Sequence, residues 1–229
     1  DSLAAELKRF RELAVLTADR PEVTAALQDA DMVAALRPVL QEIADKTGAL
    51  DIRLVGLDGA QLAGVQAGVA NSHAGEAYFE RSMDGALGTA HLMPSQAGPR
   101  RFIFAAPVFS AAGPVMGALV VSAGVEAVEG AWRGARPALF FTDTDGMIFV
   151  SNRSELVMRS RKAGDFIQYT ARERSGYDLW TVDAGRYLPR RALHLTKDLP
   201  AIDMRGEILV DLAPARQLAA LQAAVAAAG

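Results

Sequence analysis

The chain has 229 residues, of which 51 % are hydrophobic, enough for one or two domains with cores of their own. Its formal net charge is −3 and its basic residues form no block, which argues against nucleic acid as a partner. Cysteine is absent, which excludes disulfides and cysteine-ligated metals and fits the cytoplasm or a periplasmic domain without disulfides. No apolar run reaches the roughly 18 residues of a membrane span, and the first residues lack a signal-peptide pattern. Because the chain opens and closes in helical patterns, we expect an excised fragment.

The first 47 residues are predicted to be helical. The apolar positions of the first helix recur at helical spacing: Leu3, Leu7, Phe10, Leu13 and Leu16. Pro21 stands where the first residue of a second helix belongs. A third helix is expected over residues 31–46 and is closed by Gly48. This segment is therefore interpreted as a stalk.

Strand patterns follow from Ile52. Residues 52–57 and 61–65 flank an Asp-Gly turn and predict a hairpin, and residues 77–87 predict a short helix. A central hairpin is expected within residues 99–126, around a Gly-Pro turn.

The first strand of the central hairpin alternates between two sets of side chains. Arg100, Phe102 and Phe104 share one face, while Arg101 and Ile103 point to the other. An arginine beside two aromatic rings suits an anionic or planar small molecule. The alternative is an edge arginine whose stem covers a phenylalanine core.

The second half of the sequence repeats the pattern of a strand, an Asp-Gly turn and a second strand. A helical pattern over residues 125–135 carries Glu129 and Trp132, and residues 137–150 again form an apolar strand, an Asp-Gly turn and a strand. The repetition suggests two lobes of one kind. Further elements are expected in this order: a helix at 155–161, strands at 177–182, 192–195 and 207–212, and a helix at 214–228. The predicted class is α+β, with antiparallel sheets and helices on one face.

The order of these pieces resembles a known family. The segments that carry the likeness are Leu57-Asp58-Gly59, Tyr78-Phe79, 100–108, 117–121, Glu129 with Trp132, and 145–151. Together they resemble the periplasmic double Cache (tandem PAS-like) domain of sensor histidine kinases, in particular the C4-dicarboxylate-sensing, DctB-type kinases. The resemblance covers roughly residues 10–212, and its weight comes from the order of the segments.

The resemblance implies a sensor. Its domains would be a stalk (1–47), a membrane-distal ligand-binding lobe (48–135), a membrane-proximal lobe (136–213) and a C-terminal helix leading to the membrane (214–229). It further implies a periplasmic domain of an inner-membrane homodimer, whose missing kinase part acts on a cytoplasmic response regulator. No cofactor is implied, and this fragment is not expected to be an enzyme.

The sequence departs from the dicarboxylate pattern. Glu76 stands where the family usually has an arginine, and Ser122 where it usually has a lysine. Arg100 is the cation retained, and Arg101 takes its place if the register shifts by one residue. A dianion needs several charge-assisted contacts, so these departures argue against a succinate-like ligand bound in the usual way.

Two ligand types stay open. A monoanion or amphiphilic acid would bind to Arg100 with aromatic walls, or a cationic group would meet Glu76, which is otherwise a surface carboxylate. The full set of candidate ligand-binding residues is Arg100, Tyr78, Phe102, Phe104, Glu76, Ser122, Met83 and His73.

Catalytic and metal motifs are absent from the sequence. The three histidines have no metal-ligand spacing, and there is no nucleophile elbow, P-loop or dinucleotide fingerprint. The alternatives to a kinase sensor are a ligand-free dimerisation or interaction module and a chemoreceptor ectodomain, with an enzyme last.

Overall fold

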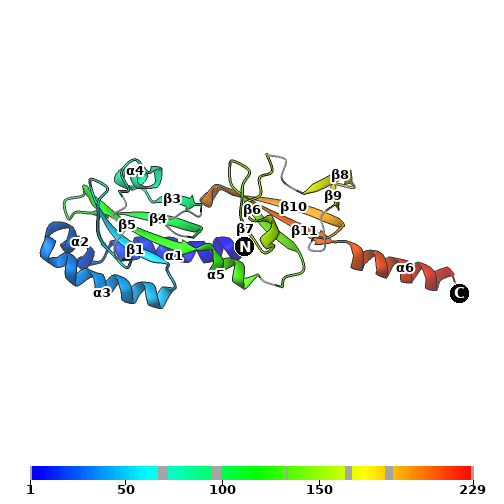
Figure 1. The fold of residues 1–229 in the computed structure, drawn as a ribbon, viewed down its shortest axis with the longest axis horizontal. Helices are drawn as coiled ribbons and strands as arrows, with labels where there is room; N and C mark the ends of the chain where they lie inside the picture. Colours follow the sequence, from blue (N-terminus) through cyan, green and yellow to red (C-terminus); the bar gives the residue numbers. More distant parts are fainter. Residues whose placement is uncertain are drawn as a thin grey trace. The chain divides into compact units, whose positions relative to one another are not determined.

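The computed structural model describes residues 2–66, 72–93, 99–132, 134–162, 167–183 and 188–227. The chain divides into two compact units, unit 1 (Asp1–Val128) and unit 2 (Glu129–Gly229), each with one antiparallel sheet (Figure 1). Parts of two predicted segments, 125–135 and 214–228, lie outside the described residues. No helix in the described ranges is long and apolar enough to cross a membrane.

Unit 1 begins with helices and continues as a five-stranded sheet. Its elements are α1 (Ser2–Ala18), α2 (Pro21–Gln28), α3 (Ala30–Thr47), β1 (Asp51–Gly56), β2 (Gln61–Gly64), α4 (Ala77–Met83), β3 (Gly88–Leu92), β4 (Arg101–Phe109), β5 (Val115–Gly124) and the start of α5 (Val125–Ala131). The strand order is β2-β1-β5-β4-β3. The three predicted N-terminal helices and the central hairpin are thus confirmed.

Local signals set the ends of the first helices. Pro21 lies in the first turn of α2, where its missing N–H costs nothing. The Asp29 carboxylate caps α3 by accepting a hydrogen bond from the amide of Asp31 at 3.0 Å. Gly48 ends α3 in the left-handed conformation, with φ of 73°.

The buried stripe of α1 differs from the expected one. Leu3, Leu7 and Phe10 are buried as predicted, but Leu16 is 70 % exposed and Ala14 is fully buried instead. The reason is that α1 packs against β4 and β5, where small side chains let the helix approach the sheet. The described part of α1 therefore contributes to the core of unit 1.

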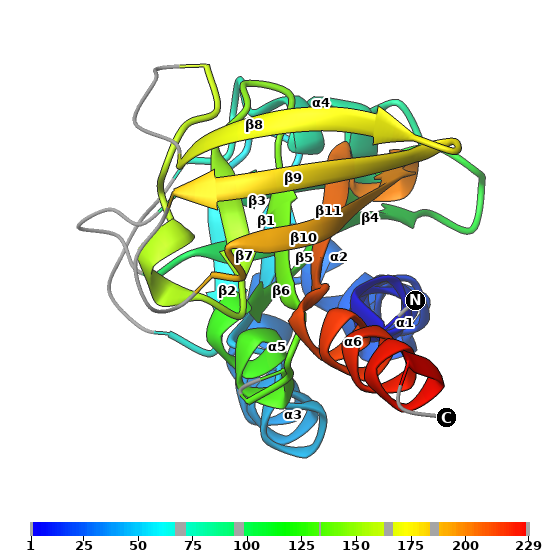
Figure 2. The same cartoon turned by 90° about the vertical axis from the view of Figure 1, so that its right-hand side faces the viewer.

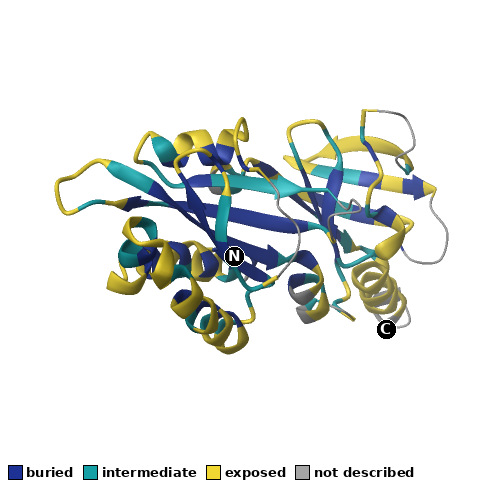
Figure 3. Ribbon diagram, turned by 60° about the vertical axis from the view of Figure 1, so that its left-hand side comes forward, coloured by how far each residue is buried: buried dark blue, intermediate teal, exposed yellow. Residues whose placement is uncertain are grey.

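The two faces of the unit 1 sheet are covered differently. Helices α1 to α3 pack on one face, where β5 offers Leu119 and Val121, and α4 packs on the other (Figure 1). Under α4 lies a compact apolar cluster whose members include Phe79, Ile103 and Val120. The central strands β1, β4 and β5 are mostly buried, whereas the edge strands β2 and β3 are mostly half-buried (Figure 3). This sandwich places the α4 face inside the unit.

Unit 2 carries a six-stranded sheet. Its elements are the end of α5, β6 (Ala138–Thr142), β7 (Ile148–Ser151), a 3₁₀ turn (Ser154–Leu156), β8 (Gln168–Arg174), β9 (Tyr177–Asp183), β10 (Arg191–Leu199), a second 3₁₀ turn (Pro200–Ile202), β11 (Met204–Asp211) and α6 (Ala213–Ala227). The order β7-β6-β11-β10-β9-β8 repeats that of unit 1 and adds β8 at one edge (Figure 2). The predicted two lobes of one kind are therefore found.

Two elements of unit 2 differ from the expectation. The helix predicted over residues 155–161 is wrong: after the 3₁₀ turn, Met158 adopts φ of 65° and its amide bonds to the carbonyl of Ile148. Strand β8 was not predicted, because its side chains are all exposed and show no apolar alternation. It forms because the tight Ser175-Gly176 turn, with both φ values positive, folds it onto β9.

The close approach of α4 to β3 at Gly88 generates a prediction. A Cβ atom at Gly88 would lie 1.8 Å from the carbonyl oxygen of Tyr78. We expect Gly88→Ala to lower the free energy of unfolding by about 1–3 kcal/mol, because α4 must move away from the sheet. Urea denaturation measures this change.

The matched control is Gly124→Ala at the end of β5. Its added Cβ would meet only the Glu126 carboxylate, at an ordinary 3.6 Å. We expect a change within about 0.5 kcal/mol. Equal effects of the two substitutions would contradict the packing of α4 on β3.

Candidate functional site

Polar and charged side chains gather on the α4 face of unit 1, which is otherwise apolar. We call them the α4-face cluster: Asp51, Arg53, His73, Tyr78, Arg101 and Ser122. Residues directly opposite on antiparallel strands share a face, and Asp51 pairs with Ser122, which in turn pairs with Ile103. All six members are buried.

Two members of the cluster lie on β1 and form an ion pair. The Nε–H of Arg53 donates to Oδ2 of Asp51, and the side chains are 7 % and 1 % exposed. The other oxygen, Oδ1, accepts a hydrogen bond from the amide of Gln66 at 3.3 Å. Arg53 and Asp51 are two residues apart on one strand, so they necessarily share a face. The spacing of Asp51 and Arg53 along β1 thus brings the two charged groups together.

A second buried guanidinium belongs to Arg101 at the start of β4. Burial lowers the pKa of Arg101, and the positive charge of Arg53 acts in the same direction. The Asp51 carboxylate and the Tyr78 phenol act in the opposite direction. An arginine side chain stays charged in proteins, so this site holds two guanidinium groups near one carboxylate.

His73 and Tyr78 are joined by a hydrogen bond of 2.9 Å between Nδ1 and the phenol oxygen. Burial, then the charge of Arg53, lowers the pKa of His73 to about 4. Burial, then the charge of Glu76, raises the pKa of Tyr78 to about 12. Both groups are therefore neutral at pH 7. The buried Nε2 atom of His73 has no hydrogen-bond partner among the described residues, and an unpaired buried polar atom calls for an explanation such as a bound water or ligand.

The structure brings some of the predicted site residues together. Tyr78, Ser122 and His73 meet in the α4-face cluster. Met83 is partly buried and packs against the neighbouring apolar cluster. Glu76 is exposed at the N-terminus of α4 and stands outside the buried group.

The alternation expected for β4 is confirmed, but α4 covers the other face. Phe102 and Phe104 are opposite Ala123 and Val121, in the layer beneath the three N-terminal helices. Arg100 lies before β4, and its guanidinium contacts Glu126 of α5 at 3.9 Å. The register therefore places Arg101, the alternative to Arg100, in the α4-face cluster. It also places the two phenylalanines on the face of the sheet opposite to Tyr78.

Asp51 and Arg53 were missed by the sequence reasoning. A signal was present, because they are charged residues spaced by two within an otherwise apolar strand. Such spacing places both charges on one face of a strand whose neighbours are also apolar. A strand buried on both faces holds such charges only if they are paired or serve a site.

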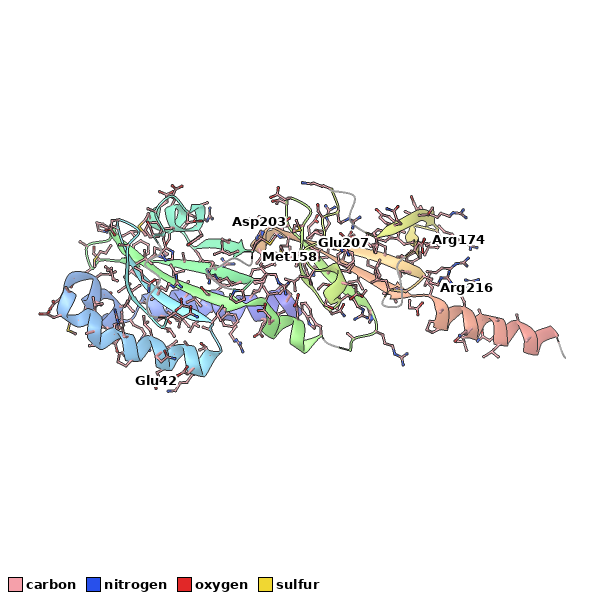
Figure 4. The ribbon with its side chains drawn as sticks, viewed as in Figure 1. Glu42, Met158, Arg174, Asp203, Glu207 and Arg216 are labelled. Atoms are coloured by element: carbon pink, nitrogen blue, oxygen red, sulfur yellow. The ribbon has the colours of Figure 1, made fainter. Side chains whose placement is uncertain are left out.

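Unit 2 has two open cavities whose residues differ in character from the α4-face cluster. One, of about 870 Å³, lies between the β8–β9 strands and the start of α6, and its charged residues are exposed. Another, of about 520 Å³, borders β10 and β11 and reaches buried Glu207. Figure 4 shows Glu207 within the sheet, whereas Arg174 lies at the tip of the β8–β9 hairpin. Neither combines buried cations with unpaired polar atoms as the α4-face cluster does.

Solved sensor domains share this fold. The sensor domain of the V. cholerae histidine kinase DctB has a TM-score of 0.74 and 18 % identity, with 91 % of each chain covered. The ligand-binding domain of the Campylobacter jejuni chemoreceptor Tlp3, solved with 4-methylisoleucine, has a TM-score of 0.61 and 11 % identity, covering 90 % of this chain and 81 % of that one. The predicted double Cache fold is thereby confirmed.

A second chemoreceptor domain has a similar fold. The ligand-binding domain of Pseudomonas fluorescens CtaA, solved with L-alanine, has a TM-score of 0.58 and 16 % identity, covering 83 % of this chain and 84 % of that one. No protein-family model matches the chain, and no curated protein matches it.

The environment of His73 generates a prediction about acid stability. Its pKa is about 4 in the folded chain against roughly 6.5 when unfolded, so only the unfolded state binds the proton between these values. Lowering the pH from 6.5 to 4 should therefore cost on the order of 2–3 kcal/mol of unfolding free energy through this group.

Denaturant titrations at several pH values measure this slope. In His73→Gln the slope between pH 6.5 and 4 should flatten. The control His91→Gln, on β3, removes a histidine outside the cluster and should keep the slope. An unchanged slope in His73→Gln would contradict the buried neutral imidazole.

Proposed function

We propose that the chain is the extracytoplasmic sensor domain of a membrane histidine kinase and that unit 1 binds a small organic monoanion. The site is the α4-face cluster, with Arg101 as the principal cation. The likeness of the fold to the DctB sensor domain supports the sensory role. In this proposal the chain binds and signals, and catalysis belongs to a kinase part of the same protein.

One observation carries the ligand class. The buried cluster holds two guanidinium groups and one carboxylate, while His73 and Tyr78 are neutral at pH 7. Its net charge is therefore +1. A ligand with one negative charge would bring the sum of these formal charges to zero, and its carboxylate could accept charge-assisted hydrogen bonds from a guanidinium group.

The same charge count ranks other ligands. A dicarboxylate would leave the cluster with a net charge of −1, because Asp51 already neutralises Arg53. A cationic ligand would add to the existing excess. The apolar side chains beside the cluster, among them Ile103, Val120 and Phe79, suit a short hydrocarbon or aromatic body. A monocarboxylate or amphiphilic acid matches both features.

The signalling part of the proposal follows the expected domain plan. Residues 48–135 form the ligand-binding lobe, on which helices α1 to α3 of the segment 1–47 pack, and residues 136–213 relay the change. Residues 214–229 lead towards the membrane that anchors a periplasmic homodimer. A ligand shifts such a receptor only by its difference in affinity between two states. The output is the transfer of the signal to a kinase and its response regulator.

A second candidate is a chemoreceptor ectodomain that binds amino acids. The chemoreceptor domains with this fold were solved with L-alanine and with 4-methylisoleucine. In this chain, Asp51 beside Arg101 offers opposite charges to the two ends of a zwitterion. Against it, both Asp51 oxygens already accept hydrogen bonds from Arg53 and Gln66.

Ligand binding is tested by thermal shift and calorimetry on the purified chain. The probes are propionate, pyruvate, benzoate, succinate and L-alanine. A monocarboxylate at a hundred times its dissociation constant should stabilise the chain by about 2.7 kcal/mol. Arg101→Gln should weaken its binding by about 10- to 100-fold, because a charge-assisted hydrogen bond is lost.

The matched control is Arg100→Gln, which removes the neighbouring arginine from the other side of β4. It should leave the affinity within a few-fold of the original. Stronger binding of succinate than of any monocarboxylate would contradict the charge count. An L-alanine response would favour the chemoreceptor, and no response to any probe would favour a ligand-free interaction module.

A further inference from the structure

Unit 2 contains a second buried ionisable group, which the ligand site does not use. His194 on β10 lies between two carboxylates on the neighbouring strands. Its Nδ1 is 2.8 Å from Oδ2 of Asp178 on β9, and its Nε2 is 2.7 Å from Oε2 of Glu207 on β11. One imidazole thus connects three adjacent strands.

With both carboxyl groups ionised, this geometry requires a doubly protonated ring. A carboxylate accepts hydrogen bonds and donates none, so each ring nitrogen of His194 must carry a proton to bond at these distances. A neutral imidazole keeps only one N–H and would place a nitrogen lone pair against a carboxylate oxygen. The His194 charge is therefore part of the packing between β9, β10 and β11.

The remaining contacts of the two carboxylates come from other elements. Asp178 also accepts a hydrogen bond from the Trp180 indole at 2.8 Å. Glu207, whose side chain is 2 % exposed, also accepts from Arg161, which follows the first 3₁₀ turn and bonds to the phenol of Tyr169 on β8. Trp180 is stacked between Tyr169 and His194, with ring centroids 3.8 and 3.9 Å away.

Charge balance depends on the proton of His194. Two carboxylates face the ring and Arg161, so the group is neutral with an imidazolium and carries −1 without it. Further charged groups border the adjoining hollow and alter the field around it: Asp143, Lys162, Asp198, Asp203 and Arg205. Lys162 bonds to the carbonyl of Thr144, and Arg205 to the exposed Asp198.

We propose that unit 2 has a further function as a proton sensor, in which deprotonation of His194 releases the connection between β9, β10 and β11. The half-exposed Asp178 is the partner that can turn to water, whereas Glu207 stays paired with Arg161. Strand β11 continues almost directly into α6, which starts at Ala213. Loss of the His194 charge beside Glu207 therefore changes the electrostatic field at the strand that leads into the C-terminal helix.

The direction of the response follows from the titration. Burial alone opposes the charged ring, but the hydrogen bonds to Glu207 and Asp178 outweigh it and raise the pKa of His194. A group with a raised folded pKa stabilises the fold fully below its unfolded pKa, roughly 6.5. This stability is lost as the pH rises through the folded pKa, so the sensor responds to a rise in pH above roughly 6.5.

Tryptophan fluorescence tests the proposal in the complete chain. Trp132→Phe leaves Trp180 as the single tryptophan, stacked on His194. Because an imidazolium quenches indole emission more than a neutral imidazole, emission should rise with pH, with a midpoint above about 6.5. Hydrogen exchange on either side of the midpoint, corrected for intrinsic rates, should show lower protection of the β9 and β10 amides at high pH.

Three variants in the Trp132→Phe background distinguish an effect of the His194 proton from an effect of the substitution on folding. His194→Gln should give a flat emission profile. Asp178→Asn should lower the midpoint by about one pH unit or more, because an opposite charge is removed. Asp198→Asn removes an exposed charge from the same strand and should move the midpoint by much less than Asp178→Asn does.

Two results would overturn the proposal. One is a flat profile between pH 5.5 and 9.5 in a chain that retains His194. The other is a midpoint above 6.5 without any change in the exchange of β9 and β10, which would leave His194 as a purely structural charge. Asp178→Asn serves as the decisive variant if His194→Gln does not fold.

Discussion

The register of β5 decides which side chains of unit 1 meet under α4. This strand pairs with both β1 and β4, so it aligns Asp51 and Arg53 with the β4 residues of the same face. If β1 and β4 each shifted by one residue relative to β5, the side chains of Arg53 and Arg101 would point into the apolar layer beneath α1 to α3. There a guanidinium has neither water nor a counter-charge. The apolar opposite face, with Leu54 and Phe104 fully buried, excludes that slip.

The two units share a strand order but treat buried charge in opposite ways. In unit 1, the formal charges of the α4-face cluster sum to +1, and the Nε2 atom of His73 finds no hydrogen-bond partner in the described residues. Unit 2 balances two carboxylates against Arg161 and a protonated His194. The same framework therefore carries buried groups whose formal charges differ between the two units. That division suits a receptor in which one lobe binds and the other transmits.

Much of the fold can be predicted from local signals. Pro21, Gly48 and the two Asp-Gly turns mark where elements begin and end, and their recurrence indicates the two lobes. Which face of β4 is covered by α4 cannot be read in this way, because both faces of that strand are apolar and only tertiary packing distinguishes them. The sequence therefore predicts Arg100 as the cation of the candidate site, whereas the α4-face cluster contains Arg101. Strand β8 was not predicted for a related reason, since an exposed polar edge strand carries no period-2 hydrophobic pattern.

The composition of β8 has a consequence for self-association. An edge strand presents unpaired backbone groups to solvent and is a template for strands of other molecules. Within the described sheet, β8 is such an edge, and it carries Arg172, Glu173 and Arg174 in succession. Charged side chains on an edge oppose the approach of a second, identical edge and keep it hydrated. The polar sequence that hides this strand from a periodicity search thus also protects the domain from polymerising through it.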